Sequence, residues 1–305
     1  MAEKTNKLGM GWLPDPPDFR DYTVEREEVS SRLARLGEKE PVRAMLEQVG
    51  VSEPVRARLT DSVDLRRWCA PIEDQGSLGS CTAQAAVGMV EYFERRAFDN
   101  HIDASRLFLY KVTRNLLHWT GDTGAYLRTT MGALTLFGVP PEEYWPYEID
   151  DFDEEPPAFT YAFAQSYQAI SYYRLDPPET SKPELLERIK TNLAAGLPSM
   201  FGFTVYSSIR QAAATGEIPY PTPGERRIGG HAVVAIGYDD GLEITNTDGE
   251  DPETTGALLI RNSWGTDWGD EGYGWLPYEY VLKGLAIDWW SILKNEWINT
   301  DVFKL

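Results

Sequence analysis

The sequence predicts an α+β protein of two lobes, one helical and one rich in β-strands, with a cleft between them. Apolar residues recur at helical spacing in the first half of the chain, whereas after residue 165 short apolar runs are bounded by Gly, Pro and Asp, as β-strands are. Segregated helices and strands are typical of α+β proteins, and ligands commonly bind where two lobes meet. A chain of 305 residues is long enough for two lobes of ordinary size.

The change in composition along the chain divides it into four segments. The first segment is expected to be an arm, because GWLPDPPDFRDY is rich in proline and the charged stretch after it reads as two short helices, broken at Pro41 and Pro54. The segments are 1–60, the N-terminal arm; 61–165, the helical lobe; 166–293, the β-rich lobe; and 294–305, a C-terminal tail.

The helical lobe is predicted from three helices. The first begins at or just before Cys81, because small and apolar residues recur after it at helical spacing. The other two cover about 105–117 and 124–137, and Gly138 closes the last one. The positions that define the buried face of the first helix are Ala83, Ala86, Val87, Val90, Phe93 and Ala97.

The β-rich lobe is predicted from five short runs of β-branched, aromatic and other apolar residues. One helix interrupts them, opened by a capping box from Ser181 to Glu184 and ended at Gly196. The runs are YQAISYY, SMFGFTV, HAVVAIGY, GALLIRN and GYGWLP.

The formal net charge of −19 comes almost entirely from the chain beyond residue 60. The electrostatic field of so negative a protein repels nucleic acid and anionic membranes, so neither is expected as a partner. No apolar run approaches the roughly 18 residues of a membrane span, and the N-terminus lacks the apolar core of a secretory signal. We therefore expect a cytoplasmic protein.

Two acidic runs, 148–155 and 239–253, read as solvated loops, with a calcium site as the alternative. Neither run has the ordered ligand spacing of a calcium loop. A zinc site built from Cys69, Cys81 and a histidine is a further alternative, but the eleven residues between the cysteines fit no common ligand spacing. No metal and no cofactor is therefore expected.

Cys81 stands directly behind a Gly-Ser pair and at the first turn of a predicted helix. The positive end of the helix dipole and the free N–H groups of the first turn stabilise a thiolate there. Glycines at 76 and 79 let the backbone approach closely. Two cysteines cannot form a disulfide framework, so the thiol is expected to be reduced, and either chemically active or simply packed.

A nucleophilic thiol also needs a base, and the chain has three histidines. His101 and His118 read as surface or packing residues. His231 opens the most apolar strand, and alternation places it on one face with Val233 and Ala235. A buried strand therefore fixes the direction of the imidazole.

Asn262 ends the next apolar run, ALLIRNSWG. If this run pairs antiparallel with the histidine strand across the acidic loop 239–256, Asn262 can reach the imidazole of His231. Cys81 then completes a set of nucleophile, base and orienting residue. Each residue has a structural explanation by itself, but the three together predict a catalytic site.

Four segments resemble those of the papain-like cysteine peptidases, in a cytoplasmic prokaryotic form. PIEDQGSLGSC is similar to the glutamine-to-cysteine segment of the family, GGHAVVAIGY to its histidine strand and IRNSWGTDWGDEGY to its asparagine segment. TGAYLRTTMGALTLFGVPPEEYWPYE resembles the glycine-containing substrate strand with the helix and turn behind it. The resemblance covers about residues 61–292 and implies the papain-like fold, a helical lobe and an antiparallel β-barrel-like lobe with the active-site cleft between them.

The resemblance also implies a role for each residue. Cys81 would be the nucleophile, His231 the general base and acid, and Asn262 the residue that orients the imidazole. Gln75 would stabilise the oxyanion together with the N–H of Cys81, and Trp264 would shield the contact between the histidine and the asparagine from water. The residues expected at the substrate are Gly124, Thr123, Gly230 and Trp264.

The sequence departs from secreted family members at two positions. Leu78 stands where they carry a cysteine, which agrees with a reducing compartment. Thr82 stands where they carry an aromatic ring, and the change in packing near Gln75 predicts slower or narrower activity. Cys69 would silence the enzyme if it paired with Cys81, and we predict that it is a buried free thiol.

These assignments predict a cysteine endopeptidase that hydrolyses protein or peptide substrates through a thioester acyl-enzyme. Two other classes stay open: an acyl transferase or peptide ligase, in which an amine intercepts the thioester, and a catalytically silent peptide-binding protein. Residues 1–60 stand where the family keeps an inhibitory prosegment. They are therefore either a zymogen segment that restricts the cleft from within the same chain until it is removed, or a permanent strap.

Overall fold

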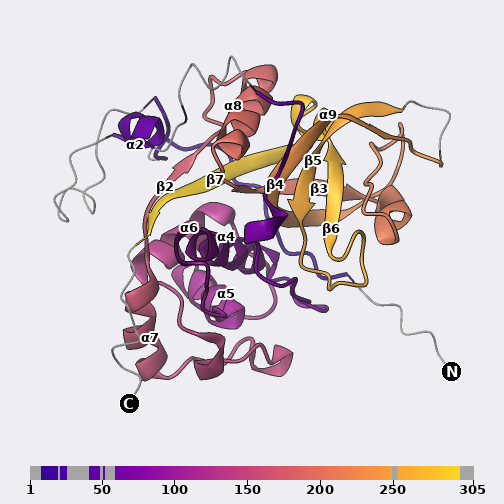
Figure 1. Ribbon diagram of the computed structural model, residues 1–305. Helices are drawn as coiled ribbons and strands as arrows, with labels where there is room; N and C mark the ends of the chain where they lie inside the picture. Colours follow the sequence, from indigo (N-terminus) through magenta and orange to yellow (C-terminus); the bar gives the residue numbers. More distant parts are fainter. Residues whose placement is uncertain are drawn as a thin grey trace, which may run out of the picture.

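The computed structural model describes residues 8–19, 21–25, 41–48, 51, 59–248 and 253–295. Within them, helices gather at one end of the molecule and an antiparallel sheet at the other, as Figure 1 shows. This is the α+β arrangement that the sequence predicts. The boundaries drawn at residues 60, 165 and 293 stay predictions.

The helical end consists of α4 Cys81–Phe98, α5 Arg106–Leu116, α6 Leu127–Leu136 and α7 Ala158–Ala164. α4 begins at Cys81, as predicted, and ends where Asp99 adopts a left-handed conformation. The predicted helix 124–137 begins three residues later than expected, because Gly124 has a φ of 73° and Tyr126 is extended. Single turns of 3-10 helix connect these elements: η1 Arg66–Trp68, η2 Glu142–Tyr144, η3 Ile149–Asp151 and η4 Gln165–Tyr167.

The sheet has the strand order β2-β7-β3-β4-β5-β6, with β1 added beside β4, and every one of these pairs is antiparallel. β4 therefore lies between β3 and β5, which places both of them against the strand that carries His231. The strands are β1 Ser62–Asp64, β2 Ala169–Arg174, β3 Ser199–Tyr206, β4 Arg227–Ile244, β5 Thr254–Arg261, β6 Tyr273–Pro277 and β7 Ala286–Asn295.

Helix α8, Lys182–Ala194, is the helix predicted between the strands. The side chain of Ser181 accepts a hydrogen bond from the N–H of Glu184 at 3.4 Å, which confirms the predicted cap. η5, Ser207–Ala213, follows β3, and α9, Tyr278–Leu282, follows β6. α8 and α9 contact each other and the sheet on the side away from α4, as Figure 1 shows.

Strands β3 and β4 separate two hydrophobic cores, because successive residues of a strand point to opposite faces of the sheet. Met200, Ala232 and Val234 belong to the core shared with α4, α5 and α6. Phe201 and Val233 belong to the core shared with α8 and α9. β4, which carries His231, is thus fixed by packing on both faces.

The acidic stretch 239–256 contains more strand than the sequence predicts. β4 continues to Ile244 and pairs it with Thr254, the first residue of β5. Both residues are buried, which stabilises pairing at the ends of the predicted loop. The register shifts between Asp239 and Glu243, so a bulge accommodates the extra residues of β4.

Two pieces of the arm contact the body. Residues 8–13 run between the helical end and the sheet, and α2, Val42–Gln48, packs Val42 and Leu46 into the core of α8 and α9. α2 corresponds to one of the two helices predicted for the arm. The helix predicted before Pro41 and most of the predicted tail lie outside the described residues, and β7 includes the first two residues of that tail.

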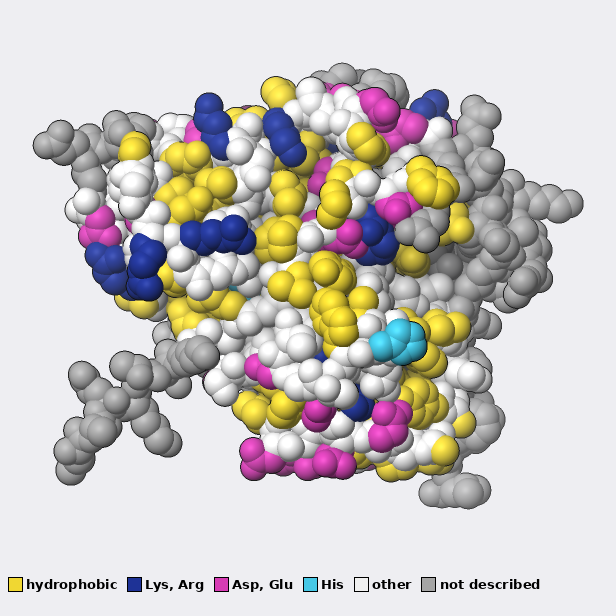
Figure 2. Space-filling view, turned by 180° about the vertical axis from the view of Figure 1, so that it is seen from behind, with side chains coloured by type: hydrophobic (Ala, Val, Ile, Leu, Met, Phe, Trp, Pro, Cys, Tyr) yellow, Lys and Arg dark blue, Asp and Glu magenta, His cyan; other side chains and the backbone are white. Residues whose placement is uncertain are grey.

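On the face seen in Figure 2, acidic side chains line the edge at the helical end, and most of the Lys and Arg side chains lie towards the sheet end. Hydrophobic side chains are scattered between them. Within the described ranges, no helix has the length and apolar character needed to cross a bilayer.

Candidate active site

The antiparallel pairing of β4 and β5, which the sequence predicted, brings Asn262 beside His231. Nε2 of His231 lies 2.7 Å from Oδ1 of Asn262. Trp264 stacks on the imidazole, with ring centroids 4.3 Å apart and an interplanar angle of 19°. The asparagine oxygen therefore favours the tautomer of His231 that carries its proton on Nε2. The stacked indole of Trp264 prevents the imidazole from tilting.

The second ring nitrogen of His231, Nδ1, has no hydrogen-bond partner among the described residues. Burial lowers the pKa of His231 to about 4, although the hydrogen bond with Asn262 acts in the opposite direction. The ring is therefore neutral at pH 7. A neutral imidazole with an unoccupied nitrogen can accept a proton from a nearby thiol.

Cys81 is the first residue of α4 and is fully buried. Burial raises the pKa of its thiol to about 11, against the effect of four backbone amides that reach the sulfur. These amides belong to Ala232 of β4, to Gly11 and Trp12 of the arm, and to the next residue of α4. Because Ala232 follows His231 in the chain, the sulfur lies against the strand that carries the imidazole. In this buried state the thiol keeps its proton.

Gln75 links the loop before Cys81 to the segment after β5. Its Nε2 donates to the carbonyl oxygen of Leu78 at 2.8 Å, and its Oε1 accepts from the hydroxyl of Ser263 at 2.6 Å. The N–H of Gln75 also donates to the carbonyl of Ser263 at 2.9 Å. These bonds fix the orientation of the side-chain amide, and the bond to Leu78 uses one of the two N–H groups of Nε2.

The segment predicted to bind substrate is tied to the loop before Cys81 by a relay of hydrogen bonds. The N–H of Gly124 donates to the hydroxyl of Tyr110 at 3.0 Å, which donates to Asp122 at 2.7 Å. Asp122 also accepts from the N–H of Gly79 at 2.9 Å. Thr123 makes a local bond to the carbonyl of Gly124 at 3.2 Å. The backbone of this segment that pairs with the arm belongs to Ala125, the residue after Gly124.

Residues 8–13 of the arm, here named the cleft segment, cover this site. At one end, the N–H of Gly9 donates to the carbonyl of Gly76 at 3.0 Å. The carbonyl of Gly9 accepts from Nε1 of Trp264 at 3.0 Å. The tryptophan that stacks on the imidazole therefore also holds the arm.

At the other end, the cleft segment pairs with the predicted substrate strand. The N–H of Ala125 donates to the carbonyl of Gly11 at 2.8 Å, and the N–H of Leu13 donates to the carbonyl of Ala125 at 3.1 Å. Across the cleft, the N–H of Trp12 donates to the carbonyl of Gly230 at 3.3 Å. Gly230, predicted at the substrate, is thus occupied by the arm.

Glycines make this close approach possible. A Cβ at Gly11 would lie 1.9 Å from the carbonyl oxygen of Gly79, and one at Gly9 would lie 2.6 Å from that of Gly76. On the body, a Cβ at Gly124 would lie 2.1 Å from the carbonyl oxygen of Gly11. The pattern Gly-x-Gly therefore lets the arm pass directly over Cys81.

Cys69 is a buried free thiol, as predicted, and Cys81 is free as well. Burial raises the pKa of Cys69 to about 11. Among the described residues, no three His, Cys, Asp or Glu side chains lie together in a way that could hold a metal ion. The site residues therefore do not form a zinc site in the part of the chain that the structure describes.

Several residues of the described site were not found from the sequence, and Ser263, Trp12 and Asp288 are examples. Ser263 lies inside the recognised asparagine segment, but nothing in the sequence indicates that it contacts Gln75. Trp12 lies in the proline-rich stretch of the arm, whose unusual composition was the available signal. Asp288, which accepts a hydrogen bond from Nε1 of Trp12 at 3.1 Å, gave no signal.

Comparison with known proteins places this geometry in a family. The family model described as papain family cysteine protease matches residues 59–283. An uncharacterised peptidase C1-like protein of Acanthamoeba polyphaga mimivirus is 30% identical over 96% of this chain and 89% of its own length. The crystal structure of xylellain, a cysteine protease from Xylella fastidiosa, is 30% identical, covers 96% of this chain and 98% of its own, and has a TM-score of 0.70.

A bromelain protease from Ananas comosus shares the fold at lower identity. It is 19% identical, covers 77% of this chain and 100% of its own, and has a TM-score of 0.56. The fold and the matched segments together lead to one conclusion: the chain belongs to the papain family of cysteine proteases.

Proposed function

We propose that the protein is a cysteine endopeptidase in which Cys81, His231, Asn262 and Gln75 carry out the chemistry. His231 accepts the proton of the Cys81 thiol at Nδ1, and the sulfur attacks the carbonyl carbon of a peptide bond. The C–S bond forms as the carbonyl electrons move to oxygen. Gln75 Nε2 and the backbone N–H of Cys81 then donate to that oxyanion.

Hydrolysis completes the cycle. The C–N bond breaks, and the proton on Nδ1 of His231 goes to the leaving amine, which leaves a thioester on Cys81. Water then gives a proton to His231 and attacks the thioester carbonyl, so that the C–S bond breaks and the acid product leaves. Asn262 holds the imidazole in the orientation that both steps require.

One observation carries this proposal more than any other. The imidazole of His231 is held between Asn262 and Trp264, and its Nδ1 has no partner among the described residues. The backbone N–H of Ala232, the next residue in the chain, reaches the Cys81 sulfur. A histidine with a purely structural role is normally hydrogen-bonded at both nitrogens when it is fully buried. The free nitrogen therefore supports a role in proton transfer.

We also propose that the cleft segment inhibits the enzyme in the same chain. The carbonyls of Gly9 and Gly11 accept hydrogen bonds from Trp264 and Ala125. These donors differ from the proposed oxyanion donors, Gln75 and the N–H of Cys81. The segment therefore fills the cleft without placing either of these two carbonyls where Cys81 could attack it, as an inhibitor does and a substrate does not.

Cleavage of a peptide library by the full chain tests the catalytic assignment. Wild type should release peptide fragments, and Cys81→Ala should lose at least about 10³-fold in kcat/KM. Cys69→Ala removes the other thiol and should keep the wild-type rate. Equal activity of wild type and Cys81→Ala would reject the assignment. Products lengthened by an added amine, instead of hydrolysed, would identify a transferase.

A further inference from the structure

The hydroxyl of Tyr147 joins two residues of the loop before Cys81. It donates to the carbonyl oxygen of Gln75 at 3.1 Å and lies 2.6 Å from Oγ of Ser80. A phenol has one proton to donate, so the hydroxyl of Ser80 donates to Tyr147 in this arrangement. Burial raises the pKa of Tyr147 to about 12, so the phenol keeps its proton at neutral pH. One oxygen atom therefore links Gln75 to the residue that precedes Cys81.

These two bonded residues frame the proposed oxyanion site. Nε2 of Gln75 is one proposed donor, and the N–H of Cys81, which follows Ser80, is the other. The loop between them forms no helix or strand and includes Gly76, at a φ of 60°, and Gly79. Glycine permits many backbone conformations, so the loop by itself defines the spacing of its ends poorly. A bond at both ends limits how far the two donors can separate.

Ser80 makes this contact in place of a local hydrogen bond. It is the N-cap residue of α4, where a serine side chain normally accepts from an N–H of the first helical turn. The structure has no such side-chain bond, and the ψ of 12° at Ser80 differs from the extended value of a cap. Ser80 is fully buried, and Tyr147 satisfies its hydroxyl. The start of the helix is therefore held by Tyr147 instead of by an ordinary cap.

Charged groups fix the position of Tyr147 itself. Its N–H donates to Oε1 of Glu142 at 2.8 Å, and the same oxygen accepts from Nη2 of Arg106 at 2.7 Å. The guanidinium of Arg106 lies over the Tyr147 ring, 5.3 Å from its centroid, and its Nη1 pairs with Glu73. Arg106 is buried at the first position of α5, and Glu73 lies just before Gln75 in the chain. The phenol and the loop are thus held from the same helix.

We infer that Tyr147 is a positioning residue, which sets the distance between the two proposed oxyanion donors by holding Gln75 and Ser80 at once. The inference rests on the proposed function, because it concerns the oxyanion site of that reaction. Without the hydroxyl, the carbonyl of Gln75 keeps only the N–H of Leu78, at 3.4 Å, among the bonds of the described residues. The loop can then relax, and the donors move apart.

The first test is Tyr147→Phe in the full chain, which removes the hydroxyl and keeps the ring. The donors bind the oxygen strongly only when it carries negative charge, so kcat should fall roughly tenfold while KM stays within about twofold. The pH–rate profile should keep its histidine inflection, because the hydroxyl bonds Gln75 and Ser80 and not His231. A wild-type kcat, or a loss that appears in KM or as a shifted inflection, would overturn the inference.

Tyr92→Phe is the matched control. The hydroxyl of Tyr92 is also buried and also donates to a backbone carbonyl, that of Gly196, at 3.0 Å. Tyr92 lies on α4, and Arg96 donates to the same carbonyl, which therefore keeps a partner in the variant. Its kcat should equal that of wild type. If Tyr92→Phe loses as much as Tyr147→Phe, the loss of any buried hydroxyl explains the effect and the inference fails.

Ser80→Ala tests the same bridge from its other end, and it also serves if Tyr147→Phe does not fold. The kcat of Ser80→Ala should fall by a similar factor. The double variant with Tyr147→Phe should be no slower than either single variant, because all three lack the same bridge. Losses that multiply to roughly a hundredfold would mean that the two residues act separately, which contradicts the inference.

A cycle with Gln75→Ala separates this inference from the proposed chemistry. Gln75→Ala alone should lower kcat about 10²-fold. Adding Tyr147→Phe should then cost less than about twofold more, because the spacing of two donors no longer matters when one is missing. A further tenfold loss would refute the inference and leave Gln75 in the mechanism. A wild-type kcat for Gln75→Ala would reject the proposed oxyanion site and the inference together.

Discussion

The carbonyl oxygen of Gly11 accepts a hydrogen bond from the N–H of Ala125 at 2.8 Å, beside the loop that precedes Cys81. This contact pairs the arm with the strand segment where the sequence predicts substrate. It requires a residue without a side chain at position 11, since a Cβ there would lie 1.9 Å from the carbonyl of Gly79. The arm therefore occupies the backbone at which the sequence predicts substrate.

Gly11→Val should displace the cleft segment and activate the enzyme. The new side chain collides with backbone that cannot move aside, so docking weakens by about 2 kcal/mol or more and kcat/KM rises at least about tenfold. Peptide cleavage under initial-rate conditions checks this. Gly132→Ala is the matched control, because a Cβ at Gly132 meets nothing within 4 Å, and its rate should equal that of wild type. A Gly11→Val enzyme no faster than wild type would refute inhibition by this segment.

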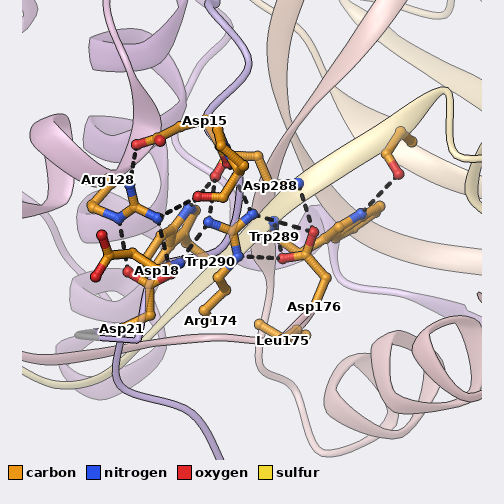
Figure 3. Close-up of polar contacts among 12 residues, drawn as sticks. Asp15, Asp18, Asp21, Arg128, Arg174, Leu175, Asp176, Asp288, Trp289 and Trp290 are labelled. Atoms are coloured by element: carbon orange, nitrogen blue, oxygen red, sulfur yellow. Dashed lines mark hydrogen bonds and ion pairs between the residues drawn. The ribbon is translucent and has the colours of Figure 1, made fainter. Parts of the chain in front are cut away.

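Asp21→Ala should also release the arm. Its carboxylate bonds Arg128 at 2.7 Å and Arg174 at 3.4 Å, and its side chain is only 3% exposed (Figure 3). Arg128 keeps Asp15 and Arg174 keeps Asp176 and Asp288, so the variant loses only the charged hydrogen bonds that join the arm to the body, which are worth about 1.5–3 kcal/mol. Limited proteolysis should cut the arm of this variant much faster than that of wild type.

The control for Asp21→Ala is an exposed pair. Asp248 bonds Arg210, which is 61% exposed, so Asp248→Ala should leave the rate of arm cleavage unchanged. Equal protection of the arm in wild type and Asp21→Ala would mean that these buried ion pairs do not hold it.

Acid should favour release of the cleft segment. Burial lowers the pKa of His231 to about 4 in the covered site, from an ordinary value of 6.5. A lowered histidine pKa stabilises the covered state fully above pH 6.5, and this stability is lost as the pH falls from 6.5 towards 4, up to about 3 kcal/mol. Limited proteolysis of Cys81→Ala protein should therefore cut the arm faster at pH 5 than at pH 7.

Another buried group acts in the opposite direction. Burial raises the pKa of Asp288 to about 7, so its protonation as the pH falls does not favour release. Adding His231→Gln to the Cys81→Ala chain isolates the histidine, and the acceleration between pH 7 and pH 5 should disappear. If the double variant keeps the same acceleration, another group controls the arm.

Asn262→Ala should lower kcat about 10²-fold with little change in KM, because the contact of Asn262 in the site is with the imidazole of His231. Ser263→Ala provides a comparison. Its hydroxyl fixes Gln75, so the variant should lose activity without a shift of the histidine inflection in the pH–rate profile. An Asn262→Ala enzyme with wild-type kcat would remove this residue from the mechanism.

The fold and most of the described site could be predicted because the evidence for them is local in the chain. Helical spacing predicted a helix from Cys81, and α4 begins at that residue. Strand alternation and two apolar runs predicted the antiparallel pair that brings His231 to Asn262. The prediction of a loop over 239–256 was wrong at its ends, where the chain forms strand. The pairing of Ile244 with Thr254 and the burial of both outweigh the turn preference of the acidic residues around them.

The element types, and the candidates for nucleophile, base and orienting residue, could be predicted from the chain alone, because each depends on short-range pattern and residue chemistry. The position of Gly11 and Trp12 over Cys81, and the hydrogen bond from the indole to Asp288, emerge only in the folded chain. Trp12 and Asp288 are 276 positions apart in the chain, and no local pattern encodes a hydrogen bond over that separation. Packing of the complete chain places such residues together, since each contact depends on the position of every element between them.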